Sequence, residues 1–144
     1  MTIFVDSGVL FALHVADSPR QAPARAAFER VLSGEFGQPI TSDYVVDEGA
    51  TLVRSRTGDV DVAMDLVDRV RGCGSYPDVF TLTHIDPDDI RRAIDVFERF
   101  ADQPLSFTDA TTIALVGGSD LDQVLAFDDD FDGIVDRLDP RDIV

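Results

Sequence analysis

Short apolar runs alternate with longer amphipathic segments along the chain. Strands are predicted where such a run is bounded by polar or turn-forming residues, at 2–6, 39–41, 78–85, 123–128 and, as a short edge strand, within 133–140. Between these runs, apolar residues recur three and four positions apart, which is typical of a helix that buries one face. The alternation of strands with helices favours an α/β fold with a parallel sheet.

Six helices are expected, and several have clear capping residues. Ser18 is predicted to cap the second helix with Pro19 at its first position, and Asp86 with Pro87 starts the fifth in the same way. The expected helices span 7–16, 19–34, a segment through Val46 and Val53 that ends at Gly58, 59–71, 86–100, and a segment from Thr108 to Gly117.

Length and composition indicate the broad class of protein. The 144 residues, 44% of them apolar, suffice for one domain with a packed core, expected to span 1–144. No run approaches about 20 apolar residues, and no basic segment precedes an apolar one, so we expect a soluble, cytoplasmic protein with no membrane partner. The single cysteine, Cys73, excludes an internal disulfide and a zinc site built from cysteine pairs.

The charge balance is strongly acidic. There are 28 acidic residues against 12 basic ones, all of them arginine, and the net charge is −16. Such a surface repels itself at low ionic strength and suggests a halophilic protein that works in molar salt. There the Debye length falls to about 3 Å, so the net charge no longer argues against a nucleic-acid partner. Unfolding midpoints are expected to rise with salt concentration, and equal midpoints at low and high salt would contradict this.

Three acidic residues stand where a solvated surface charge is not expected. Asp6 ends the apolar run "IFV", Asp128 ends "VLAF", and Asp109 follows "LSFT" at a helix start. The first two are predicted at the carboxyl ends of parallel strands, where open α/β sheets bind ligands. Each one alone is also compatible with a helix cap or a first-turn acid. An ionised carboxylate beside a core costs several kcal/mol unless a partner compensates it.

Four stretches, taken in order, resemble the motifs of PIN-domain nucleases: "VDSGVLFAL", "VVDEGATLVRSR", "LSFTDATTIAL" and "VLAFDDDFD". The resemblance covers essentially the whole chain, whose length is similar to that of the VapC toxins of toxin–antitoxin pairs. It implies a PIN-like (Rossmann-like) three-layer α/β/α sandwich around a mainly parallel sheet of four to five strands. It also implies a metal-dependent endoribonuclease that forms a homodimer and is silenced by a small antitoxin protein.

The resemblance also implies which residues are catalytic. Matched one by one to the family's motifs, Asp6, Glu48, Asp109 and Asp128 are the expected ligands of Mg²⁺ or Mn²⁺, cations that prefer oxygen ligands. Four clustered acids would raise one another's pKa unless a cation compensates them. Asp47 is the alternative to Glu48, and consecutive helical residues cannot both face one site.

Further residues are expected in auxiliary roles. Asp130 is the alternative fourth ligand, or an additional one acting through water. Ser7 and Thr108 flank two of the acids and are candidates to bind metal-bound water or phosphate, although capping hydrogen bonds explain such hydroxyls equally well. Arg54 and Arg56 follow the helix of Glu48 and are weaker candidates for RNA phosphate binding; surface ion pairs are the alternative.

Other classes of protein fit the chain less well. Receiver domains and haloacid-dehalogenase-like phosphatases also place acids at strand ends, but both families use a lysine, which this chain lacks. A P-loop requires lysine as well, and no G-x-S-x-G motif of an esterase is present. Two alternatives within the PIN family stay open: an RNA-processing nuclease outside a toxin–antitoxin pair, and a non-catalytic binding module.

Overall fold

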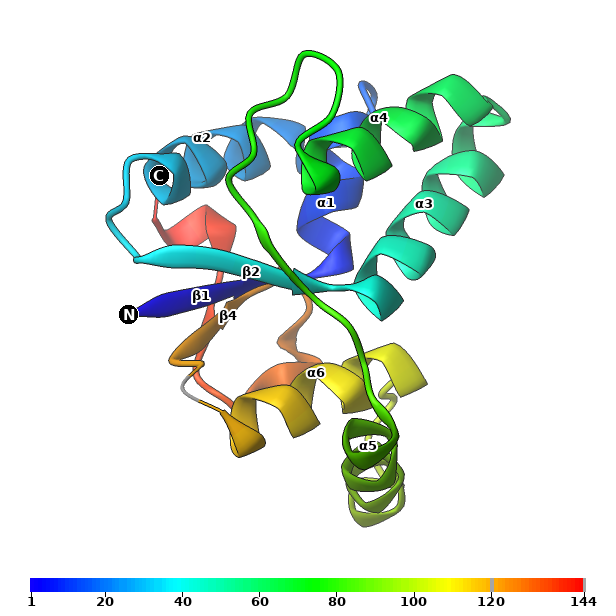
Figure 1. Ribbon diagram of the computed structural model, residues 1–144, viewed down its shortest axis with the longest axis vertical. Coiled ribbons are helices and arrows are strands. Elements are labelled where there is room, and N and C mark those ends of the chain that lie inside the picture. The colour runs from blue at the N-terminus through cyan, green and yellow to red at the C-terminus, as the bar shows by residue number, and fades with distance from the viewer. Residues whose placement is uncertain (120, 144) are drawn as a thin grey trace.

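A parallel sheet of five strands forms the centre of the molecule (Figure 1). The computed structural model describes residues 1–119 and 121–143. The strand order is β3-β2-β1-β4-β5, and every neighbouring pair is parallel. The strands are β1 (Thr2–Val5), β2 (Gln38–Ser42), β3 (Thr81–Thr83), β4 (Gln123–Leu125) and β5 (Arg137–Leu138).

Helices cover both faces of this sheet. Figure 1 shows α1 to α4 on one side, and α5 and α6 on the other. The helices are α1 (Ser7–His14), α2 (Gln21–Leu32), α3 (Asp43–Thr57), α4 (Val60–Arg71), α5 (Pro87–Arg99) and α6 (Phe107–Gly118), with short 3₁₀ helices η1 (Asp129–Phe131) and η2 (Pro140–Asp142). The predicted three-layer α/β/α architecture around a parallel sheet is confirmed. Across the described part of the chain, no helix is long and apolar enough to cross a membrane.

Burial explains why the central strands are so apolar. Ile3, Phe4 and Val5 of β1 are fully buried, as are Val124 and Leu125 of β4, because helices lie on both sides of these strands. Both strands end at the same edge of the sheet, where the backbone N–H of Asp6 donates to the carbonyl of Leu125 at 3.1 Å. The residues that follow β1 and β4 are therefore brought together at the carboxyl edge.

A glycine lets α3 approach α1 and α4 closely. A Cβ atom added at the buried Gly49 would lie 3.2 Å from Cδ1 of Leu66 in α4 and 3.9 Å from Cβ of Ser7 in α1. The absence of a side chain at this position therefore brings the neighbouring Glu48 close to the end of β1.

Several element boundaries differ from the prediction, most of all in α2, β3 and β4. The predicted start of the second helix at Ser18 and Pro19 is wrong: α2 begins at Gln21, and the Ser18 hydroxyl accepts a hydrogen bond from the backbone N–H of Arg20 at 3.2 Å in the preceding turn. The strand predicted at 78–85 is shorter, because β3 pairs only with the last three residues of β2. The strand predicted at 123–128 ends at Leu125, where its pairing with β1 and β5 ends.

Candidate functional site

Asp6 is a buried carboxylate without adequate compensation. It occupies the N-cap of α1, yet its side chain accepts no capping hydrogen bond. Its side chain lies 5% exposed, and Oδ1 has no hydrogen-bond partner. Burial, then the charges of Asp109 and Glu48, raises the pKa of Asp6 to about 7, although the nearby N–H groups of Ser7 and Gly8 oppose the shift. The helix-cap interpretation therefore does not account for this carboxylate.

Glu48 reaches the same place from α3. The buried Ser7 hydroxyl, adjacent to Asp6, donates a hydrogen bond of 2.5 Å to Oε1 of Glu48. This contact joins residues 41 positions apart and orients one carboxylate oxygen of Glu48. Asp47, the alternative to Glu48, is exposed and accepts a weak hydrogen bond from the Thr51 hydroxyl at 3.4 Å.

Asp109 is held in the first turn of α6 by a reciprocal capping box. The Ser106 hydroxyl accepts from the Asp109 backbone N–H at 3.0 Å, and Oδ2 of Asp109 accepts from the Ser106 backbone N–H at 3.0 Å. Burial raises the pKa of Asp109 to about 6, and the charges of Glu48 and Asp128 add to this shift against the hydrogen bonds from Ser106. The capping box therefore engages Oδ2 of Asp109, while the negative charges of Glu48 and Asp128 disfavour ionisation of the same carboxyl group.

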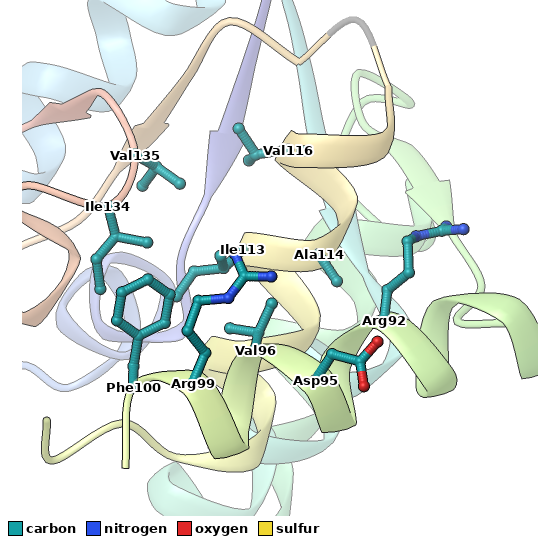
Figure 2. A pocket seen from close by; sticks show the side chains of 11 residues that line it. Arg92, Asp95, Val96, Arg99, Phe100, Ile113, Ala114, Val116, Ile134 and Val135 are labelled. Atoms are coloured by element: carbon teal, nitrogen blue, oxygen red, sulfur yellow. The ribbon is translucent and has the colours of Figure 1, made fainter. Parts of the chain in front are cut away.

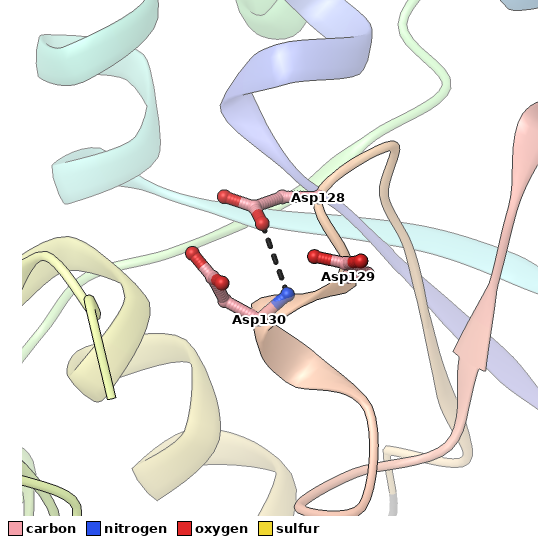
Figure 3. A group of neighbouring side chains, drawn as sticks. All are labelled: Asp128, Asp129 and Asp130. Atoms are coloured by element: carbon pink, nitrogen blue, oxygen red, sulfur yellow. Dashed lines mark hydrogen bonds between the residues drawn. The ribbon is translucent and has the colours of Figure 1, made fainter. Parts of the chain in front are cut away.

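Asp128 directly follows Phe127, three residues beyond the end of β4, and begins an acidic turn. Its Oδ1 accepts from the backbone N–H of Asp130 at 2.9 Å, and Figure 3 shows the Asp128 and Asp130 carboxylates on the same side of this turn. Carboxylate oxygens of Asp128, Asp129 and Asp130 all lie within 4.8 Å of one another. Desolvation and the two neighbouring carboxylates raise the pKa of Asp130. Asp128 and Asp129 are exposed, unlike Asp6 and Asp109.

Electrostatic coupling joins the four predicted ligands into one group. Asp6 is affected by the charges of Asp109 and Glu48, and Asp109 by those of Glu48 and Asp128. Among the described residues, however, only the turn at 128–130 gathers three acidic side chains at the spacing of a shared ion. The carboxyl edge of the sheet thus collects negative charge from β1, α3, α6 and the segment after β4. A divalent cation suits this donor set, since it compensates the repulsion and supplies a partner for the Asp6 oxygen.

The remaining predicted residues are Thr108 in α6 and Arg54 and Arg56 in α3. Thr108 is part of the first turn of α6, and its carbonyl accepts hydrogen bonds from the hydroxyls of Thr111 and Thr112 at 2.6 and 3.3 Å. Arg54 and Arg56 are exposed in the last turn of α3. In the part of the chain that the structure describes, no ion pair involves either arginine, so surface ion pairing does not explain them.

Two residues outside the predicted set, Ser106 and Arg137, hold the site in place. Ser106 caps α6 through Asp109, and the spacing Ser-x-x-Asp in "LSFTDA" is a local signal for such a box. Arg137 donates to the carbonyls of Ala126 and Phe127 at 3.0 and 3.4 Å and so fixes the segment before Asp128. No local pattern marks Arg137, because its contacts join segments ten and eleven residues apart.

A hollow of about 400 Å³ between α5, α6 and residues 134–135 lies apart from the acidic group (Figure 2). Its lining is largely apolar and includes the charged residues Arg92, Asp95 and Arg99, and none of the predicted site residues contributes to it. The candidate site is therefore the acidic edge of the sheet rather than this hollow.

Comparison with known proteins finds similar solved structures. No family model and no curated protein matches the sequence. VapC20 from Mycobacterium tuberculosis, a sarcin-ricin loop cleaving toxin, is similar in structure with a TM-score of 0.77 and 27% identity, over 92% of this chain and 96% of that one. A toxin–antitoxin complex from Klebsiella pneumoniae matches with a TM-score of 0.63 and 18% identity, over 96% and 97% of the two chains. FitAcB from Neisseria gonorrhoeae matches with a TM-score of 0.66 and 15% identity, over 96% of this chain and 97% of that one.

The fold is therefore that of PIN-like α/β proteins. Within that class, the resemblance to the VapC-type toxins is confirmed by VapC20, and the structures from Klebsiella pneumoniae and Neisseria gonorrhoeae share the fold.

Proposed function

We propose that this chain is a metal-dependent endoribonuclease and the toxin of a VapBC-type toxin–antitoxin pair. The observation that carries the proposal is the buried Asp6 carboxylate, which has an unpartnered oxygen and faces the charges of Asp109 and Glu48. A purely structural acid at a strand end would accept a capping hydrogen bond or reach solvent. The likeness to VapC20, a sarcin-ricin loop cleaving toxin, supports RNA as the substrate class.

The proposed catalytic residues are Asp6, Glu48, Asp109 and Asp128, with Asp130 as an additional ligand. Together they would hold Mg²⁺ or Mn²⁺, which supplies charge compensation for the scissile phosphate and activation of water. Ser7 orients Glu48 through its short hydrogen bond, and Ser106 holds Asp109 in the first turn of α6. Burial at Asp6 keeps solvent away from the inner part of the site, which strengthens electrostatic interactions there.

Partners are proposed from the same resemblance and from exposed apolar surface. Leu52 and Met64 on the α3–α4 hairpin, and Ile94 and Phe97 on α5, are 43–46% exposed. Surfaces of this kind suit a small antitoxin and a second copy of the chain. We propose a cytoplasmic homodimer in a high-salt cell, and light scattering that gives a monomer mass in molar salt would contradict the homodimer.

The test of function is RNA cleavage by the purified protein in molar salt. Wild type with Mn²⁺ is expected to cut a structured RNA, and chelation of the metal or the substitution Asp6→Asn is expected to slow cutting at least about 100-fold. If wild type and Asp6→Asn leave the RNA equally intact, the nuclease proposal fails and a non-catalytic PIN module takes its place. If both cut equally well, Asp6 is not catalytic. Cleavage without an adjacent antitoxin gene would favour an RNA-processing nuclease instead.

A further inference from the structure

A second hollow, of about 550 Å³, lies directly beside the acidic turn. It forms where the connection between α1 and α2 meets the C-terminal segment, since η2 packs against α2. Three of the chain's twelve arginines line it, together with an aromatic ring and three acids: Arg20, Arg137, Arg141, Phe127, Asp128, Asp129 and Asp132. In a chain of net charge −16, this grouping of arginines next to a predicted metal ligand is unusual.

Two of the three arginines, Arg137 and Arg141, already form ion pairs within the protein. Arg137 is ion-paired with Asp132 at 2.6 Å and Asp139 at 3.2 Å, and its side chain is only 12% exposed. Arg141 is paired with Asp139 at 2.7 Å and donates to the carbonyl of Phe127 at 3.3 Å. These contacts anchor the segment that leads to Asp128, and carboxylates neutralise both charges.

Arg20, by contrast, forms no ion pair with a carboxylate of the described residues. Its guanidinium carbon lies 5.0 Å from the centre of the Phe127 ring, a cation–π contact that positions the group over the hollow. Within the described residues, no acceptor forms a hydrogen bond or ion pair with this guanidinium, and Arg20 is exposed. A guanidinium presents several N–H donors in a planar fork that matches the oxygens of a phosphate. Arg20 therefore combines a fixed position with free hydrogen-bonding capacity.

We infer that this hollow binds a backbone phosphate of the RNA next to the one that is cut, and that Arg20 is its ligand. The inference rests on the proposed ribonuclease function and names a substrate-binding residue for it. Asp128 belongs both to the proposed metal site and to the wall of the hollow, so a strand whose scissile phosphate lies at the metal passes this surface. Phe127 is only 2% exposed and cannot stack with a base, so the hollow recognises phosphate rather than base sequence.

The substitution Arg20→Gln tests this site against a matched control. Arg25 lies five residues further on, is exposed on α2 and does not line the hollow; its charge acts on Arg69 instead. Arg25→Gln therefore removes the same charge from the same part of the chain. For Arg20→Gln we expect KM for the RNA that wild type cleaves to rise about tenfold with kcat within about twofold, because a non-reacting phosphate contributes equally to ground-state and transition-state binding.

A salt series separates a phosphate contact from a structural effect. Loss of one phosphate contact is expected to reduce the slope of log Kd against log salt concentration by about 0.7 for single-stranded RNA. Arg20→Lys, which keeps the charge without the fork, is expected to restore the slope and part of the affinity. Arg25→Gln is expected to change neither the slope nor KM.

The outcomes distinguish this site from the function on which it rests. RNA cleavage with unchanged KM and salt slope in Arg20→Gln would overturn the phosphate site and leave the ribonuclease intact. An equal change in Arg20→Gln and Arg25→Gln would also overturn it, because general charge rather than this hollow would then be responsible. Absence of RNA cleavage and binding in wild type would overturn both proposals.

Discussion

Replacing Glu48 with glutamine is expected to reduce RNA cleavage at least about 100-fold, whereas replacing the adjacent Asp47 with asparagine leaves it within about twofold. Glu48 accepts the hydrogen bond from Ser7 beside Asp6, and its charge acts on both Asp6 and Asp109. Asp47 points to solvent and contacts Thr51. Loss of an oxygen ligand affects the chemical step more than loss of a surface charge. Initial rates with Mn²⁺ in excess measure the effect.

The two substitutions control for each other because each removes one negative charge, and the two positions are adjacent in α3. Glutamine retains an oxygen that can accept from the Ser7 hydroxyl, so the fold is expected to persist and unfolding midpoints to stay close to wild type. A large loss of cleavage in Asp47→Asn with Glu48→Gln unaffected would assign the α3 ligand to Asp47. An equal loss in both would show that α3 contributes charge without a specific ligand.

Asp6→Asn is expected to stabilise the metal-free protein at neutral pH by a few kcal/mol, since one unit of pKa shift corresponds to about 1.4 kcal/mol, while it slows cleavage at least about 100-fold. The pKa of Asp6 is raised from 3.8 to about 7, so between about pH 4 and pH 7 the folded state binds more protons than the unfolded state. Stability contributed by the protonated carboxyl is therefore present at low pH and lost as the pH rises through about 7. Asparagine carries no charge at any pH, and its neighbours Asp109 and Glu48 accept hydrogen bonds.

His14 also contributes to the pH dependence of stability, so the effect of Asp6 has to be measured as a difference between wild type and Asp6→Asn. Burial, and then the charge of Arg69, lowers the pKa of His14 to about 4, while the Arg69 Nε donates to its Nε2 at 2.8 Å. Between about pH 4 and the ordinary value of 6.5 the unfolded state binds more protons at this residue, so its contribution rises with pH and opposes that of Asp6. The informative quantity is the difference in unfolding free energy between Asp6→Asn and wild type, measured in urea with chelator at several pH values. A difference that does not grow between about pH 4 and pH 8 would contradict the account.

The succession of strands and helices along the chain can be predicted from the sequence, because each buried strand or amphipathic helix leaves a local pattern of apolar residues. The apolar run at 2–6 predicts a strand, and Gly58 and Gly72 end α3 and α4 as expected, each with φ close to +70°. The predicted start of α2 at Ser18 and Pro19 is wrong, because the capping pattern at Ser18 belongs to a turn that the local sequence does not distinguish from a helix start. Edge strands were predicted too long, since their length depends on a partner strand far away in the chain.

The candidate site was only partly accessible from sequence. Asp6, Asp109 and Asp128 were marked by apolar neighbours, and Glu48 by resemblance to a family motif. The hydrogen bond from Ser7 to Glu48 and the position of Arg20 over Phe127 join segments 41 and more than 100 residues apart. Contacts of this kind depend on how the strands are ordered in the sheet, and no local pattern specifies that order.

The most direct test of the central claim is an anomalous difference map from crystals of the protein grown with Mn²⁺. The account predicts a peak at coordination distance, about 2.1 Å, from carboxylate oxygens of both Asp6 and Asp109, with Glu48 or Asp128 completing the protein ligands. A peak confined to the turn at Asp128–Asp130, with Asp6 outside its coordination sphere, would contradict it.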